Sequence, residues 1–161
     1  MSSRSAPDRE WLEADGLGGF AMGAADGVRT RRYHGLLVTA TRPPAGRIML
    51  VNGFEAWVEA RGKTHALSSQ RYTPDVLHPD GVRRLMDFTA VPAPRWTYAL
   101  PGGVVVEHEL FVVKGKPLVA LAWRRRGAPG PVRLFVRPLL SGRDVHALHR
   151  ENGAFRFAAE V

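Results

Sequence analysis

Glycine and proline interrupt this sequence at short intervals, because the 161 residues include 17 glycines and 12 prolines. Both residues destabilise the interior of a helix, so no segment between these interruptions has room for a long helix. The residues in between alternate apolar with polar side chains and are rich in β-branched and aromatic types, a pattern typical of half-buried strands. The sequence therefore predicts an all-β fold in which helix is limited to short turns.

Turn residues separate the expected strands in the way that antiparallel neighbours require. The pair Arg61-Gly62 joins two strand patterns as a tight hairpin does, and Pro101-Gly102-Gly103 precedes another strand pattern. A spacing of about 8 to 12 residues is that of a sandwich or barrel, and we expect an antiparallel β-sandwich of two large twisted sheets. The expected strands are residues 34–40, 47–60, 63–67, 83–91, 104–113, 118–124, 132–139 and a short strand near Phe155.

The length of the chain suits one domain, in which about 68 to 70% of the unfolded surface is buried. We expect a flexible lead-in over residues 1–9 and a single domain over residues 10–161. The Pro- and Gly-rich stretches 41–46 and 127–131 are short enough to be loops between strands. The sequence has no cysteine, so the hydrophobic core alone must hold this domain together.

The charge and the apolar runs limit the partners of the domain. No apolar run approaches the roughly 18 residues of a membrane span, and the N-terminus lacks the apolar centre of a signal peptide, so we expect a cytoplasmic protein without a membrane partner. The net charge of +8 suggests nucleic acid, but 20 of the 23 basic residues are arginines spread along the chain. Because the motifs of nucleic-acid binders are absent, we expect no such partner. The alternatives are a solvated surface and a surface that meets an acidic neighbouring domain.

The first candidate site is the segment TRRYHGLLV, residues 30–38. Arg31, Arg32, Tyr33 and His34 supply hydrogen-bond donors, a flat ring and an imidazole, and the apolar residues after them predict a strand that would hold them rigidly. Sugar hydroxyls need paired donors and acceptors, and pyranose faces need a flat apolar ring. The structural alternative makes the arginines caps of a strand edge, packs Tyr33 on a neighbour and makes His34 a hydrogen-bonded core histidine.

The second candidate site is SGRDVH, residues 141–146, which follows the expected strand 132–139 and should therefore lie on a loop. Arg143, Asp144 and His146 carry its polar groups. The alternative is an exposed Arg143–Asp144 ion pair, worth about 0 to 1 kcal/mol. We expect this segment to lie near Tyr33-His34 on one face of the sandwich, although more than 100 residues separate the two in sequence.

Three further features favour structural interpretations. The glycines of DGLGGF, residues 15–20, lack the strand and helix that a dinucleotide-binding loop needs, so they are expected to serve the backbone. The six histidines lack the spacing and the carboxylate companions of a zinc site, and we expect neither a metal nor a cofactor. Trp96 and Tyr98 share one face of an extended segment, where core packing is favoured over a carbohydrate platform.

Three segments of the chain resemble the N-terminal domain of the bacterial and archaeal glycogen debranching enzymes of the amylo-α-1,6-glucosidase type. They are EWLEADGLGGFAMG (residues 10–23), TRRYHGLLV (residues 30–38) and SGRDVHALH (residues 141–149). The resemblance runs from about Glu10 to about His149, and the family usually carries Asn at the position of Asp15. It implies a β-sandwich that packs on a C-terminal α/α-barrel, which hydrolyses the α-1,6-glucosidic branch points of glycogen. It also implies that Arg143, Asp144 and His146 form an interface or a glucan subsite.

The carboxylates of this chain do not form an evident catalytic pair. Inverting glycoside hydrolysis needs two carboxyls about 6.5 to 9.5 Å apart, whereas the acids here fall within strand patterns (Asp87, Glu107, Glu109) or turns (Asp26, Asp75, Asp80). We therefore assign no catalytic residue and expect the isolated chain to be inactive.

The alternative to a domain of a debranching enzyme is a free-standing carbohydrate- or protein-binding β-sandwich, and polyanion binding is a weaker third hypothesis. The reading frame beyond Val161 discriminates between the first two, because several hundred further residues with paired helices would support the enzyme. A face meant for a barrel would expose an apolar or Arg-rich patch, so a weak homo-oligomer is also expected.

Overall fold

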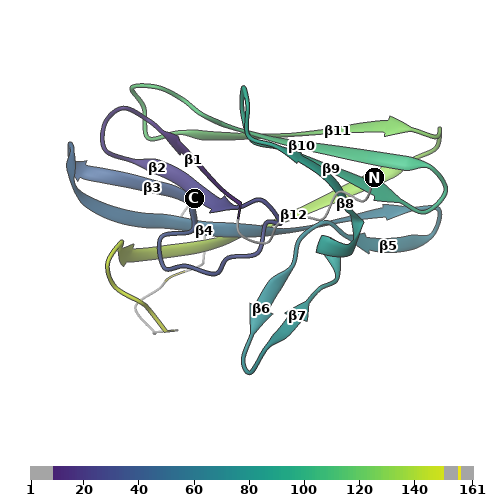
Figure 1. The fold of residues 1–161 in the computed structure, drawn as a ribbon, viewed down its shortest axis with the longest axis horizontal. Coiled ribbons are helices and arrows are strands. Elements are labelled where there is room, and N and C mark those ends of the chain that lie inside the picture. Colours follow the sequence, from purple (N-terminus) through teal and green to yellow (C-terminus); the bar gives the residue numbers. More distant parts are fainter. Residues whose placement is uncertain (1–8, 151–155, 157–161) are drawn as a thin grey trace.

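The computed structural model describes residues 9–150 and residue 156, and in it two antiparallel sheets face each other (Figure 1). A small hairpin projects below them. In the larger sheet β1 (Glu10–Ala14), β2 (Phe20–Ala24), β3 (Gly35–Arg42), β4 (Ala45–Ala60) and β12 (Val132–Asp144) lie in this order, and β5 (Lys63–Ala66) also pairs with β4. The smaller sheet has the order β11 (Val119–Gly127), β10 (Val104–Val112), β9 (Arg95–Leu100) and β8 (Leu85–Thr89). The hairpin consists of β6 (Gln70–Tyr72) and β7 (Val76–His78).

The expected antiparallel β-sandwich is confirmed, and the helix within the described residues is a single 3-10 turn, Gly81–Arg84. None of these residues forms a helix that is long and apolar enough to span a membrane. The tight hairpin at Arg61-Gly62 is also confirmed, because both residues adopt positive φ, 51° and 72°, as a two-residue turn of this kind requires. The short strand expected near Phe155 lies outside the described residues.

The long strand patterns and the four-residue strand β5 were predicted correctly, whereas the other short strands were not. The expected segment 83–91 is wrong at its start, where the 3-10 turn precedes β8. The strands β1, β2, β6, β7 and β9 were missed. The first two have only five residues each, and a single turn separates them. The most consequential error concerns β12, which continues to Asp144 through two register shifts instead of ending near Leu139.

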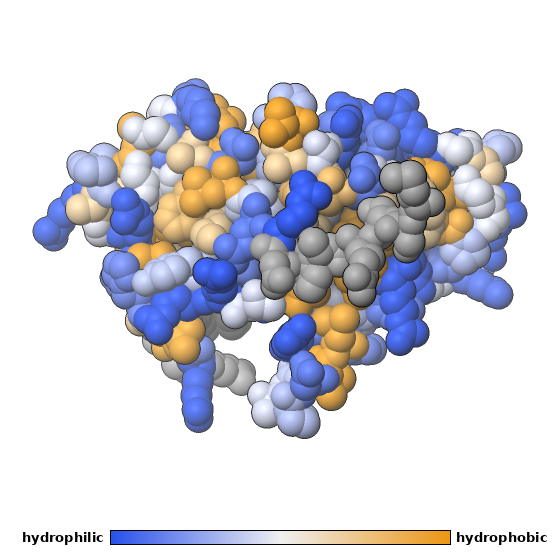
Figure 2. Space-filling model, viewed as in Figure 1, coloured by the Kyte–Doolittle hydropathy of each residue, from blue (hydrophilic) through white to orange (hydrophobic). Residues whose placement is uncertain are grey.

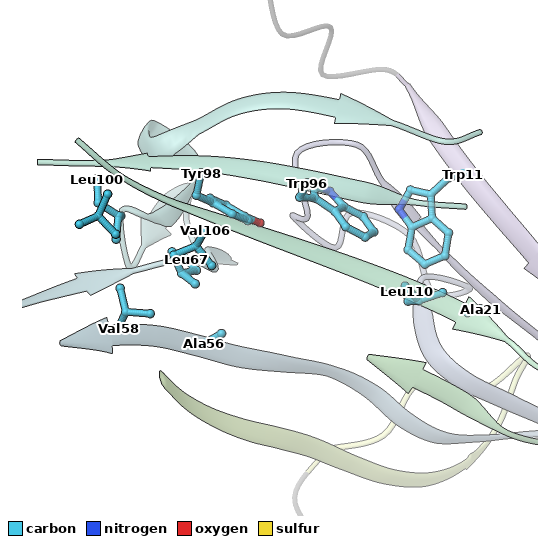
Figure 3. Close-up of a cluster of buried hydrophobic side chains, with 11 residues drawn as sticks. Trp11, Ala21, Ala56, Val58, Leu67, Trp96, Tyr98, Leu100, Val106 and Leu110 are labelled. Atoms are coloured by element: carbon cyan, nitrogen blue, oxygen red, sulfur yellow. The ribbon is translucent and has the colours of Figure 1, made fainter. Parts of the chain in front are cut away.

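The core lies between the facing surfaces of the two sheets. Alternate residues of a strand point to opposite faces, so Ala56, Val58 and Ala60 of β4 are buried while Glu59 between them is exposed. Figure 3 shows Ala56 and Val58 opposite the side chains of β9 and β10. Trp96 and Tyr98 are only 4% and 7% exposed, and the indole of Trp96 donates to the Ala25 carbonyl at 2.9 Å. The expected core packing is therefore confirmed, and a carbohydrate platform at these rings is excluded.

A row of rings crosses all four strands of the smaller sheet. Strand register places Phe88, Trp96, His108 and Trp123 side by side, one on each strand. The imidazole of His108 is stacked between the two indoles, with centroids 5.1 Å and 4.5 Å away, and its Nδ1 lies 3.3 Å from the Ala122 carbonyl oxygen. Burial lowers the pKa of His108 to about 4, which makes this ring a neutral part of the core at pH 7.

One margin of the larger sheet is not covered by the smaller one. Leu134 and Val136 of β12 are paired with Val58 and Ala56 of β4, so they point to the same inner face. Their partners are buried, yet Leu134 and Val136 are themselves more than a third exposed. We call these two side chains the uncovered margin. On the face shown in Figure 2, hydrophilic residues predominate and hydrophobic ones gather in patches between them.

Candidate functional site

The residues Arg31 to His34 form a turn that leads into β3. The backbone N–H of His34 donates to the carbonyl of Arg31 at 3.1 Å and closes this turn. The His34 ring is 2% exposed; its Nδ1 accepts the N–H of Thr30 at 3.1 Å, so its Nε2 carries the proton and donates to Glu10 Oε1 at 2.9 Å. Arg31 pairs with the same carboxylate at 2.7 Å. The structural interpretation of His34 is therefore correct, since this ring ties the turn to β1.

Arg143 is a buried residue that connects the two predicted segments through hydrogen bonds to their backbone carbonyls. Its side chain is 6% exposed, and Nη1 donates to the carbonyl of Ala147 at 2.7 Å and to that of Val145 at 3.3 Å. Nη2 donates to the carbonyl of Arg32 at 2.5 Å. Burial lowers the pKa of Arg143, and the positive charge of Arg32 lowers it further, while Asp144 opposes the shift. This one guanidinium thus connects the end of β12 to the turn before β3.

The expectation that Arg143 and Asp144 lie on a loop was wrong, because both residues belong to β12. The register shifts between Leu139 and Arg143 turn the Arg143 side chain into the protein. The alternative of an Arg143–Asp144 ion pair is not supported either. Asp144 instead accepts the backbone N–H of His146 at 2.8 Å and shapes the turn that follows the strand.

The two predicted segments meet, as expected. The hydroxyl of Tyr33 lies 3.1 Å from Nδ1 of His146, and the two rings are packed edge to face with centroids 5.8 Å apart. Arg32 donates to the His146 carbonyl at 2.8 Å, and its guanidinium lies 5.9 Å from the centroid of the Tyr33 ring. We call Arg32, Tyr33, Asp144 and His146 the junction. All four side chains are exposed, whereas His34 and Arg143 beneath them are buried.

A hollow of about 680 Å³ opens beside the junction. Its lining includes Arg29, whose Nε and Nη2 donate to Oε1 of Gln70 at 3.3 Å and 2.9 Å. Burial lowers the pKa of Arg29, and the charges of Tyr72 and Glu55 partly oppose this. Sequence reasoning missed Arg29 and Gln70, although the position of Arg29 directly before the predicted segment 30–38 was a signal. The lining also includes Arg31, Arg32, His34, Asn52, Leu139 and Arg143.

The other motifs of the sequence have structural roles in this fold. Asp15 is buried and accepts the N–H groups of Leu17 and Gly19 at 2.7 Å and 2.9 Å, a role that the Oδ1 of an asparagine could also fill. Gly18 has a φ of +100°, and a Cβ there would lie 2.5 Å from the Pro44 carbonyl oxygen. The structural interpretation of this glycine-rich turn is therefore correct.

The two glutamates of β10 in the smaller sheet form ion pairs with arginines of β11. Glu109 pairs with Arg124 at 2.5 Å, and Glu107 pairs with Arg126 at 3.1 Å. Within residues 9–150 and 156, no group of three or more His, Cys, Asp or Glu side chains is placed to hold a metal ion.

Comparison with known proteins identifies the family. The family described as "Glycogen debranching enzyme N terminal" matches residues 9–161, which is nearly the whole chain. No curated protein and no solved structure matched the chain in these comparisons. Since the family match covers both the turn before β3 and the end of β12, it includes every residue of the junction. The chain belongs to the glycogen debranching enzyme N-terminal family.

Proposed function

We propose that this chain is the domain of a cytoplasmic glycogen debranching enzyme that supports hydrolysis of α-1,6-glucosidic branch points, the chemistry being carried by a C-terminal catalytic barrel of the same enzyme. In this proposal the junction faces the barrel and contributes side chains to the interface or to a glucan subsite. No catalytic residue is assigned to the chain itself.

The observation that supports the proposal best is the way the junction is built. Its exposed polar side chains come from two segments far apart in sequence, and Arg143 fixes both segments from below through backbone carbonyls. A buried arginine that bonds main-chain oxygens on both sides leaves little freedom for the residues above it. Such preorganisation favours binding, because less conformational entropy is lost when a ligand or a partner arrives.

The chemistry of the junction suits a polyol. The Tyr33 ring offers a flat apolar face and a hydroxyl, the His146 ring offers nitrogen atoms, and Asp144 offers acceptor oxygens. The hollow beside them adds the amides of Asn52 and Gln70. Paired donors and acceptors next to a ring are the groups that a sugar needs.

The experiment uses the full-length enzyme. Asp144→Ala is expected to lower turnover or glucan affinity by more than about fivefold, which exceeds the roughly 1 kcal/mol of a surface ion pair. Asp87→Ala is the matched control, because Asp87 is an exposed carboxylate on β8, away from the junction. Unchanged kinetics in Asp144→Ala, with an intact fold shown by circular dichroism, would leave only a structural role for the junction.

A further inference from the structure

The hollow beside the junction contains a partly buried arginine that has no acidic partner among the described residues. Arg29 lies against Gly53 of β4, a residue between the segment of β4 paired with β3 and the segment paired with β5. Its side-chain hydrogen bonds go to the neutral amide oxygen of Gln70, which is itself buried. No carboxylate within residues 9–150 lies within ion-pair distance of Arg29.

The neighbouring charges increase this imbalance. Four more arginines line the hollow: Arg31, Arg32, Arg71 and Arg143. Arg31 pairs with Glu10 and Arg71 with Asp75, whereas no described carboxylate lies within ion-pair distance of Arg32 or Arg143. Glu55 is the acidic residue in the lining. The Glu55 carboxylate is already bound by Arg137. A buried charge is costly unless an opposite charge and hydrogen bonds compensate for it. The hollow therefore carries positive charge that the described residues do not neutralise.

The geometry around Arg29 favours a carboxylate. A guanidinium has five N–H donors in a planar fork, and the bonds to Gln70 use Nε and Nη2, so donors remain for a ligand. A carboxylate matches this fork with two parallel hydrogen bonds. Tyr72 and Leu139 provide apolar surface for the stem of an aspartate or glutamate side chain.

We propose that this hollow is a binding site for a carboxylate, and that an aspartate or glutamate side chain of the catalytic domain occupies it in the full-length enzyme. The source of the carboxylate rests on the proposed function, whereas the carboxylate site itself does not. The ion pair would anchor the neighbouring domain next to the junction.

The test uses acetate as the probe and saturation-transfer NMR of its methyl group as the readout, at constant ionic strength in chloride. The 161-residue chain should bind acetate, and Arg29→Gln should weaken that binding by about tenfold, because the charge-assisted bonds are lost. Arg133→Gln is the control, since Arg133 is an exposed arginine of β12 that pairs with Glu59 instead. Inorganic phosphate should displace acetate no better than chloride does.

A second variant keeps the test decisive even if Arg29→Gln does not fold. Gln70→Glu places a carboxylate of the same shape beside Arg29, so it should raise the midpoint of thermal unfolding and abolish acetate binding. Acetate binding that survives in Gln70→Glu, or that is equal in Arg29→Gln and the wild type, overturns the carboxylate site. Displacement by phosphate at lower concentration than acetate overturns the choice of ligand.

The source of the carboxylate is tested separately in the full-length enzyme. There the acetate signal should fall to the level of Arg29→Gln, because the hollow is already occupied. If the full-length enzyme binds acetate as the 161-residue chain does, the domain contact is wrong. That result is independent of the Asp144→Ala kinetics, so a failure of the contact and a failure of the proposed function can be told apart.

Discussion

Lowering the pH from 7 to 4 should destabilise this fold through His108. In the unfolded chain the ring binds a proton below its ordinary pKa of about 6.5, whereas burial between Trp96 and Trp123 lowers the pKa of His108 in the folded state to about 4. The unfolded state therefore binds more protons between these values, and the free energy of unfolding falls as the pH falls. At about 1.4 kcal/mol per pH unit, the loss reaches about 3 kcal/mol by pH 4 and stops increasing below it.

The assay is urea unfolding followed by tryptophan fluorescence at several pH values between 7 and 4. His108→Phe keeps a flat ring between the indoles and removes the titrating group, so its unfolding free energy should lack this component of the pH dependence. Carboxylates that titrate near pH 4 affect both proteins equally and cancel in the comparison. His65 needs its own variant, His65→Asn, because burial and the charges of Arg84 and Lys63 also lower its pKa.

The decisive quantity is the difference in pH dependence between wild type and His108→Phe, not the stability of either protein. Equal slopes from pH 6.5 to pH 4 would refute the reasoning, since they would mean that the folded protein accepts the proton on His108 as easily as the unfolded chain does.

Three other predictions follow from features of the fold and the junction. The isolated chain should release no reducing sugar from glycogen or isomaltose on long incubation, and activity that disappears on mutating one of its carboxylates would contradict this. Arg143→Lys should lower the unfolding free energy by about 2–4 kcal/mol, because one ammonium cannot reach the carbonyls of both Arg32 and Ala147; Arg133→Lys, at an exposed site, should cost less than about 0.5 kcal/mol in the same urea titration. The uncovered margin should drive weak self-association at high concentration, which Val136→Lys should reduce in sedimentation experiments, whereas a strictly monomeric wild type would count against it.

The sequence predicted the strands that carry a long alternating pattern, and it predicted the short β5 from the Arg61-Gly62 turn before it. The strand β10 alternates buried and half-buried residues over nearly its whole length, and this pattern is visible without knowing its neighbours. The strands β1, β2 and β9 have only five or six residues each, too few for periodicity to distinguish a strand from a loop. Such short strands form because a partner in the right register is present, and register is a property of the folded sheet.

The sequence predicted that the two candidate segments lie close together, but not all of the contacts that their residues make. Polar and aromatic residue types pointed to Tyr33 and His146, and the structure brings these two rings together. The role of Arg143 was missed, because the register shifts in β12 turn its side chain inward and no local pattern encodes them. Arg29 and Gln70 were missed for a different reason, since their contact joins the segment before the turn to a three-residue strand that was not expected.

The position of β4 next to the edge strand β12 has a consequence for synthesis on the ribosome. One edge of β4 is covered early, by β3 before it and β5 just after it, whereas the other edge pairs only with β12, near the end of the described chain. Until β12 has been translated, the nascent chain exposes a long unpaired strand edge. Such an edge invites wrong pairing with other chains, and contacts between distant segments form slowly. The larger sheet can therefore be completed only after β12 has left the exit tunnel, and until then the free edge of β4 is a site where nascent chains can aggregate.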